Sequence, residues 1–148
     1  MADSIRIPAQ YDKMFKDLCM SKINQQVFET YKDMLLFAAA LGNHHDSRIT
    51  FTKSALDPVR LSYFRGDYDL ELLNCIALVD TKEPRILNPN EEDEKIKILE
   101  EYINGGLDII FNQIYNKAGS WEDHLIDLIV SQDGEASDPL DDITKAWE

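Results

Sequence analysis

Residues 34–42 read MLLFAAALG, an apolar run that ends in a glycine. In the wider segment from about Gln25 to Leu41, apolar side chains recur every three or four residues, which predicts a helix. Because residues 34–41 are apolar on every side, we expect this helix to be surrounded by others. Gly42 is expected to end it, since glycine readily takes the left-handed position after a helix.

Apolar periodicity predicts further helices on both sides of this segment. Their approximate ranges are 8–19, 69–79, 91–103, 107–114 and 120–129. Asn90 and Ser120 are expected N-caps, and the carboxylates of residues 91–94 suit the positive end of a helix. The prediction is a mainly α protein, a compact bundle of five to six helices.

Two segments between the second and third predicted helices alternate polar and apolar residues. They are residues 48–52 and 59–63, and Asp57-Pro58 between them favours a turn. A short β-hairpin is predicted here, with an irregular connection as the alternative. Farther along, Asn104-Gly105-Gly106 is expected to kink or end a helix, because two glycines cost it about 1 kcal/mol each. Close packing of another backbone is the favoured role of these glycines, and a ligand contact is the alternative.

The chain is long enough for one domain, and its charge is uneven. Twenty-eight acidic residues against fifteen Lys and Arg give a net charge of −13, which argues against a general nucleic-acid or anionic-membrane binder. Residues 1–65 carry a net +2 and residues 66–148 a net −15. We predict a helical domain over residues 1–132 and an acidic, mobile tail over residues 133–148. No apolar run reaches the roughly 18 residues of a membrane span, so a cytoplasmic protein is expected.

Neither the two cysteines nor the three histidines form a recognisable metal or catalytic motif. Cys19 and Cys75 are expected to be buried free thiols. His44, His45 and Asp46 are weak candidates for metal ligands, but their spacing favours a polar loop after a helix. Nucleotide-binding and nucleophile motifs are missing, so no enzyme activity, cofactor or metal is predicted.

The densest basic stretch consists of Arg48, Lys53, Arg60 and Arg65. On a hairpin beside helices, these side chains could contact a phosphate backbone. Ordinary surface arginines, or a docking face for an acidic partner, are the alternatives that the sequence leaves open.

Several stretches resemble the fourth dnd-associated protein family, small proteins encoded beside bacterial DNA phosphorothioation genes. Residues 28–33 (FETYKD) and 38–42 (AAALG) are similar to one of its helices, and residues 100–107 (EEYINGGL) resemble a second segment, with Ile103 where alanine is usual. Residues 58–60 and 73–78 extend the resemblance, which covers about Arg6 to Ile114. It implies a bacterial anti-phage defence context, but it carries over no active site.

The leading hypothesis is therefore a non-enzymatic accessory subunit that docks on a larger protein of the same defence locus, a helicase, ATPase or nuclease. The expected contact residues are Arg48, Lys53, Arg60, Arg65, Asn104, Gly105 and Gly106. A DNA-binding regulator that uses the second helix and the Arg48–Arg65 region is one alternative. An acidic inhibitor that mimics DNA is another, and the sequence leaves homo-oligomers open.

Overall fold

The structure, a computed structural model, describes residues 4–20, 27–50, 58–64 and 69–135 of the 148-residue chain. It confirms the predicted mainly α fold. Five α-helices are described, α1 (Asp12–Met20), α2 (Tyr31–His44), α3 (Asp69–Thr81), α4 (Glu92–Ile110) and α5 (Trp121–Glu135). Two short strands are β1 (Ser4–Ile5) and β2 (Val59–Arg60). Single helical turns are η1 (Ala9–Tyr11), η2 (Leu61–Tyr63), η3 (Pro84–Leu87), η4 (Pro89–Glu91) and the π-helical η5 (Phe111–Tyr115).

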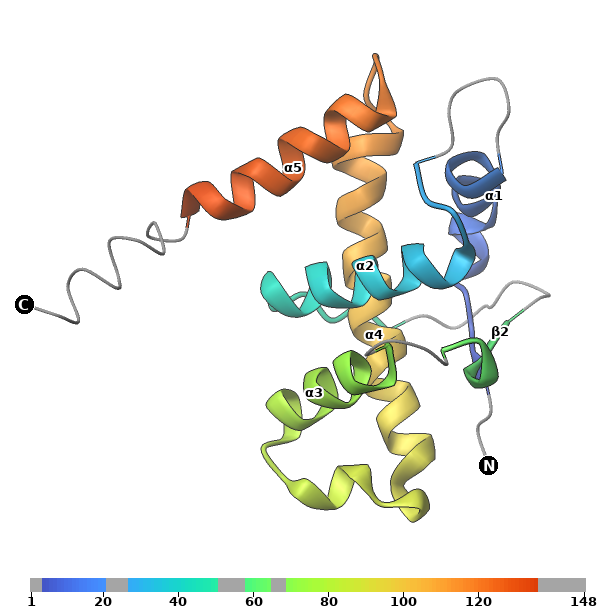
Figure 1. The fold of residues 1–148 in the computed structure, drawn as a ribbon, viewed down its shortest axis with the longest axis vertical. Helices are drawn as coiled ribbons and strands as arrows, with labels where there is room; N and C mark the ends of the chain where they lie inside the picture. The colour runs from blue at the N-terminus through green and yellow to red at the C-terminus, as the bar shows by residue number, and fades with distance from the viewer. Residues whose placement is uncertain (1–3, 21–26, 51–57, 65–68, 136–148) are drawn as a thin grey trace, which may run out of the picture.

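Helix α4 is the central element of the bundle (Figure 1). Helix α2 crosses it, α1 and α3 lie to either side, and α5 leaves from its upper end. The buried side chains of α4, including Leu99, Ile103 and Leu107, form one cluster with those of α1, α2 and α3. In the part of the chain that the structure describes, none of the helices has the length and hydropathy needed to cross a bilayer.

Glycines let the backbones of α2 and α4 touch where they cross. A Cβ atom on Gly42 would overlap the carbonyl oxygen of Tyr102, and one on Gly106 would overlap that of Ala38. The predicted close packing is therefore confirmed. The predicted kink is wrong, because α4 runs without a break through Gly105 and Gly106 to Ile110. Burial against α2 offsets the low helix propensity of the two glycines.

Helix α2 is displaced along the sequence from its predicted range. It begins at Tyr31 rather than near Gln25, because the hydroxyl of Thr30 caps it by accepting a hydrogen bond from the backbone N–H of Asp33 (3.1 Å). Gly42 lies inside the helix, so its predicted role as the helix end is wrong. Asp46 takes the left-handed position instead (φ 53°), and Ser47 N–H closes the turn on the Gly42 carbonyl (2.8 Å).

Of the second predicted segment of the hairpin, residues 59–60 form a strand and residues 61–63 form the turn η2, and the strand partner is different from the predicted one. Strand β2 pairs with β1 in antiparallel register, Val59 opposite Ile5 and Arg60 opposite Ser4. Residues 48–50 form no strand, and residues 51–57 lie outside the described part of the chain. The pairing is anchored to α4 by Arg6, whose backbone N–H and guanidinium both bind the carboxylate of Glu100, a side chain only 4% exposed.

The remaining elements follow the sequence pattern with small changes. Helix α3 lies where it was predicted, and Ser120 caps α5 by accepting a hydrogen bond from Asp123 N–H (3.4 Å). Asn90 is not the cap of α4, because Pro89 starts a separate turn and the helix begins at Glu92. Helix α5 extends to Glu135, three residues into the predicted tail, and residues 136–148 lie outside the described chain.

The two cysteines differ in burial. Cys19 is buried, as expected, whereas Cys75 is exposed on α3, so its predicted burial is wrong. The α3 pattern is apolar on nearly every side, and the sequence alone does not show which side faces the core.

Candidate interaction site

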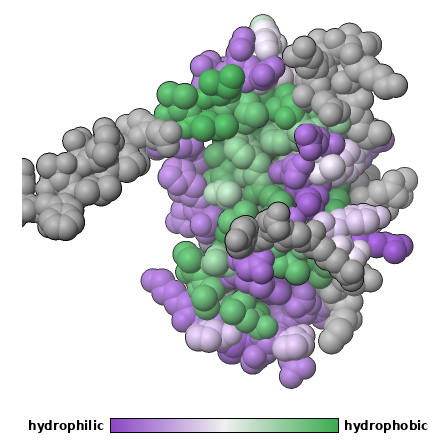
Figure 2. All heavy atoms as spheres, in the orientation of Figure 1, coloured by the Kyte–Doolittle hydropathy of each residue, from purple (hydrophilic) through white to green (hydrophobic). Residues whose placement is uncertain are grey.

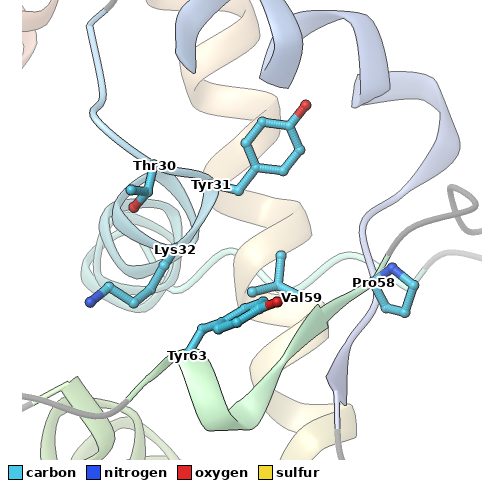
Figure 3. A pocket seen from close by; sticks show the side chains of 6 residues that line it. All are labelled: Thr30, Tyr31, Lys32, Pro58, Val59 and Tyr63. Carbon is cyan, nitrogen blue, oxygen red and sulfur yellow. The ribbon is translucent and has the colours of Figure 1, made fainter. Parts of the chain in front are cut away.

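A cleft of about 600 Å³ opens where the start of α2 meets β2 and η2 (Figure 3). It is lined by Thr30, Tyr31, Lys32, Pro58, Val59 and Tyr63. The first three come from the N-terminal end of α2, and the others come from the segment that the sequence singled out as basic. Its volume lies within the range of sites that bind small molecules or side chains, about 300–1,000 Å³.

Both walls of the cleft are held in place by ordinary local structure. The Thr30 cap fixes the first turn of α2, and Lys32 Nζ forms an ion pair with Asp69 Oδ2 of α3 (2.8 Å). On the other wall, pairing with β1 turns Val59 toward the core and leaves Arg60 exposed. The turn η2 then places Tyr63 at the edge of the cleft.

Tyr63 is the most exposed large side chain of the cleft, with 61% of its surface accessible. Figure 3 shows its ring extending from η2 toward Val59, between Lys32 and Pro58. A tyrosine offers a rigid apolar ring and a hydroxyl, and such side chains are enriched at protein–protein contacts. Its ring and hydroxyl, with the exposed Pro58 across the cleft, provide apolar contact and a hydrogen-bonding group for a partner.

Arg48, the first residue of the predicted basic stretch, lies at the surface but is held by ion pairs within the fold. Its Nη1 contacts both oxygens of Asp80 (3.0 Å each), and its Nη2 contacts Glu101 Oε2 (3.2 Å). The guanidinium also lies over the ring of Tyr102, 5.4 Å from its centre. Arg48 therefore joins the segment after α2 to α3 and α4, and its charge is neutralised within the fold.

The Tyr102 phenol completes this cluster by donating a hydrogen bond to Asp80 Oδ1 (2.6 Å). Burial, followed by the hydrogen bond to the Asp80 carboxylate, raises the pKa of Tyr102 to about 12. The neutral phenol is thus the form that the fold stabilises.

The other predicted contact residues are dispersed. Arg60 is exposed and forms no salt bridge with another described residue. Lys53 and Arg65 lie outside the described residues. The structure brings Arg60 next to the cleft through its neighbour Val59, but it does not gather the four cations that the sequence suggested.

Asn104, Gly105 and Gly106 are buried in the bundle rather than exposed at a kink. Asn104 Nδ2 donates a hydrogen bond to the carbonyl of Ile49 (3.0 Å), and Ile49 N–H donates one to the carbonyl of Glu101 (3.0 Å). A Cβ on Gly105 would overlap the Ser47 carbonyl. These residues hold the segment after α2 against α4, so a docking partner would not reach them.

His44, His45 and Asp46 belong to the end of α2. The two imidazole rings stand edge to face with centres 5.2 Å apart, and Asp46 occupies the left-handed turn position. In the described ranges, no three His, Cys, Asp or Glu side chains are arranged to hold a metal ion.

Sequence reasoning missed Thr30, Tyr31 and Lys32 as part of the site. The pattern assigned them to the middle of a long helix, whereas they form its first turn. The capping hydroxyl of Thr30, three residues before Asp33, is the signal that could have placed the helix start correctly.

This fold and site define a small, mainly α-helical protein with an open surface cleft at the start of one core helix. The model of one protein family, DNA sulphur modification system-associated protein 4, matches residues 4–145, and the chain belongs to that family. Neither the curated proteins nor the solved structures gave a significant match to the chain. Its association with a DNA sulphur modification system follows from the family.

Proposed function

We propose that the chain is a non-enzymatic accessory subunit of a bacterial defence system that depends on DNA sulphur modification. It acts by binding a larger protein of the same system, such as a helicase, an ATPase or a nuclease. The observation that carries this proposal is the cleft at the start of α2, with Tyr63 exposed at its edge.

The chemistry of the cleft supports binding rather than catalysis. The Lys32 ammonium of the lining is already paired with Asp69 and the Thr30 hydroxyl caps α2, whereas Tyr63 extends its ring and hydroxyl from η2. Such groups recognise backbone and side-chain polar atoms of a partner, while Val59 and Pro58 offer apolar contact. Proton transfer or nucleophilic attack would need a base beside a hydroxyl, and the ion pair with Asp69 raises the pKa of Lys32, which keeps this amine of the lining protonated.

A protein partner fits the charge of the chain better than direct DNA binding does. The net charge of −13 opposes phosphate contacts, and Arg48 is occupied by two carboxylates. Of the two described cations in the basic stretch, Arg60 is the one that forms no salt bridge with another described residue, and one such cation is little for a phosphate interface.

The experiment compares two substitutions at equally exposed positions. Tyr63→Ser removes the ring at the cleft, and Val79→Ser removes an apolar side chain on α3 that is 62% exposed, close to the 61% of Tyr63. The tagged chain is produced from its native locus, and the proteins that co-purify with it are identified. We expect wild type and Val79→Ser to recover a larger protein of the sulphur modification system, and Tyr63→Ser to lose most of it. Equal recovery by both variants would show that the cleft is not the docking site.

A further inference from the structure

A second concave surface lies at the other end of α2, against α5. A hollow of about 220 Å³ separates the two helices there. It is lined by Phe37, Ala40, Leu41, His44, Leu128, Ile129 and Gln132. Only the Gln132 amide and the His44 imidazole contribute polar side-chain atoms, so the hollow suits one large apolar side chain.

Helix α5 also leaves one face uncovered, and this face meets the hollow at Ile129. Leu128 is buried, but Ile126, Ile129 and Val130 are 51%, 45% and 61% exposed. Their spacing of three and four residues places them on one side of the helix. Figure 2 shows the resulting apolar band over α5, continuing onto α2. Exposed aliphatic side chains grouped in this way mark a contact surface.

The charges around this face all have the same sign. Residues 121–135 contain five acidic residues and no Lys or Arg. Glu122 and Asp123 lie one helical turn before Ile126, on the same side of α5. Asp127 lies three residues before Val130 and is therefore its neighbour on the helix surface. All three carboxylates are exposed. The apolar band is therefore bordered by negative charge.

We propose that the exposed face of α5 (Ile126, Ile129 and Val130) and the adjoining hollow against α2 form one groove, and that this groove binds a basic amphipathic helix of a partner protein. Apolar residues of that helix would cover Ile126, Ile129 and Val130, and one of them would fill the hollow. Its flanking Lys and Arg would meet the carboxylates of Glu122, Asp123 and Asp127. A second copy of the chain is a poor occupant, because two α5 helices would bring like charges together. This surface is separate from the cleft at the start of α2, so an experiment can disprove one of the two binding proposals without affecting the other.

The test uses the full chain and a fluorescein-labelled helical peptide with leucines at positions i, i+3, i+4 and i+7 and lysines elsewhere. Two variants of equal charge and composition are compared, Val130→Lys in the groove and Val79→Lys on α3, at positions 61% and 62% exposed. Fluorescence anisotropy should show binding that weakens about tenfold or more in Val130→Lys and stays within about twofold in Val79→Lys. A scrambled peptide of the same composition, which lacks the apolar stripe, should bind at least about tenfold more weakly to the wild type.

Three results would overturn the proposal. The first is equal loss in both variants or in neither. The second comes from sedimentation: the wild-type mass doubles as the protein concentration rises, and Val130→Lys keeps the monomer mass at the same concentration. A second copy of the chain would then occupy the groove. The third is a gain in peptide affinity of about tenfold on Trp147→Ser in the full chain, which would make the chain's own C-terminal residues the occupant.

Discussion

Gly106 of α4 lies directly against the carbonyl group of Ala38 of α2, with no space between them for a side chain. Gly42 of α2 has the same relation to the carbonyl of Tyr102 in α4. Each helix thus presents a glycine to the backbone of the other. This double contact sets how closely the two central helices approach, and the cleft and the groove both use α2 as a wall.

Gly106→Ala is expected to lower the free energy of unfolding by at least about 2 kcal/mol. The added methyl group would overlap a backbone oxygen, which cannot move away as a flexible side chain can. The gain in helix propensity, about 1 kcal/mol, is too small to compensate. Urea unfolding followed by circular dichroism measures the effect. Ala40→Ser, on the exposed side of α2, is the control and should change the stability by less than about 1 kcal/mol.

Arg48→Ala is expected to destabilise the fold by about 1–3 kcal/mol, because it leaves the carboxylates of Asp80 and Glu101 partly buried without their cation. Arg85→Ala is the matched control. Its ion pairs are on the surface, and losing them should lower the melting temperature much less than Arg48→Ala does. Thermal melts of the two variants provide the comparison, and similar losses in both would contradict the structural role assigned to Arg48.

Stability is expected to fall in alkaline solution as the pH rises from about 10 toward 12. Burial, together with the neighbouring carboxylates of Asp108, Asp80 and Asp17, raises the pKa of Tyr11, Tyr102 and Tyr115 to about 12. An unfolded tyrosine ionises near pH 10, so the unfolded state releases its protons first. The contribution of these phenols to the free energy of unfolding is complete below pH 10 and is lost as the pH passes through 12. Urea titrations across this range test the sign, and Tyr102→Phe should make the decline less steep.

The two thiols are expected to react at very different rates. Cys75 is exposed, whereas Cys19 is buried and its pKa is raised to about 12, first by burial and then by the nearby Asp33 charge. With a maleimide at neutral pH, the folded wild type should take up one label, and Cys75→Ser should take up none. A second label should appear only in denaturant. Rapid labelling of folded Cys75→Ser would show that Cys19 is accessible.

Lys82→Gly is expected to stabilise the protein by about 0.5–1 kcal/mol. Lys82 adopts φ 58° at the end of α3, where its N–H donates to the Leu78 carbonyl (2.7 Å), and glycine takes this conformation without steric cost. Lys82→Ala removes the long side chain but keeps the Cβ atom, so it should bring no gain. A rise in stability for both variants would assign the effect to charge rather than to backbone strain.

The helices could be predicted because their apolar spacing reports burial directly. Most of the 34–41 run is buried as expected, although Ala40 is exposed, and Ser120 caps the last helix. The role of Gly42 and Gly106 could not be read in the same way. A glycine at a helix end and a glycine at a helix crossing look alike in one sequence, and only the position of the second helix separates them.

The candidate site was predicted in part. Residues 59–63 were predicted to form a strand, and Val59 and Tyr63 of this segment line one wall of the cleft. The strand partner is β1, more than fifty residues earlier. The local alternation of polar and apolar residues does not indicate which distant segment a strand pairs with. For Arg48 the sequence indicated a charge but not its neighbours, because Asp80 and Glu101 lie 32 and 53 residues away along the chain.

Native mass spectrometry of the tagged chain, produced from its native locus and purified gently, tests the central claim most directly. The chain alone has a mass of 17.0 kDa. The account predicts a complex with a larger protein of the DNA sulphur modification system for the wild type, and its loss in Tyr63→Ser. A wild-type spectrum with only the 17.0 kDa species, from cells in which the whole locus is expressed, would contradict the accessory-subunit function.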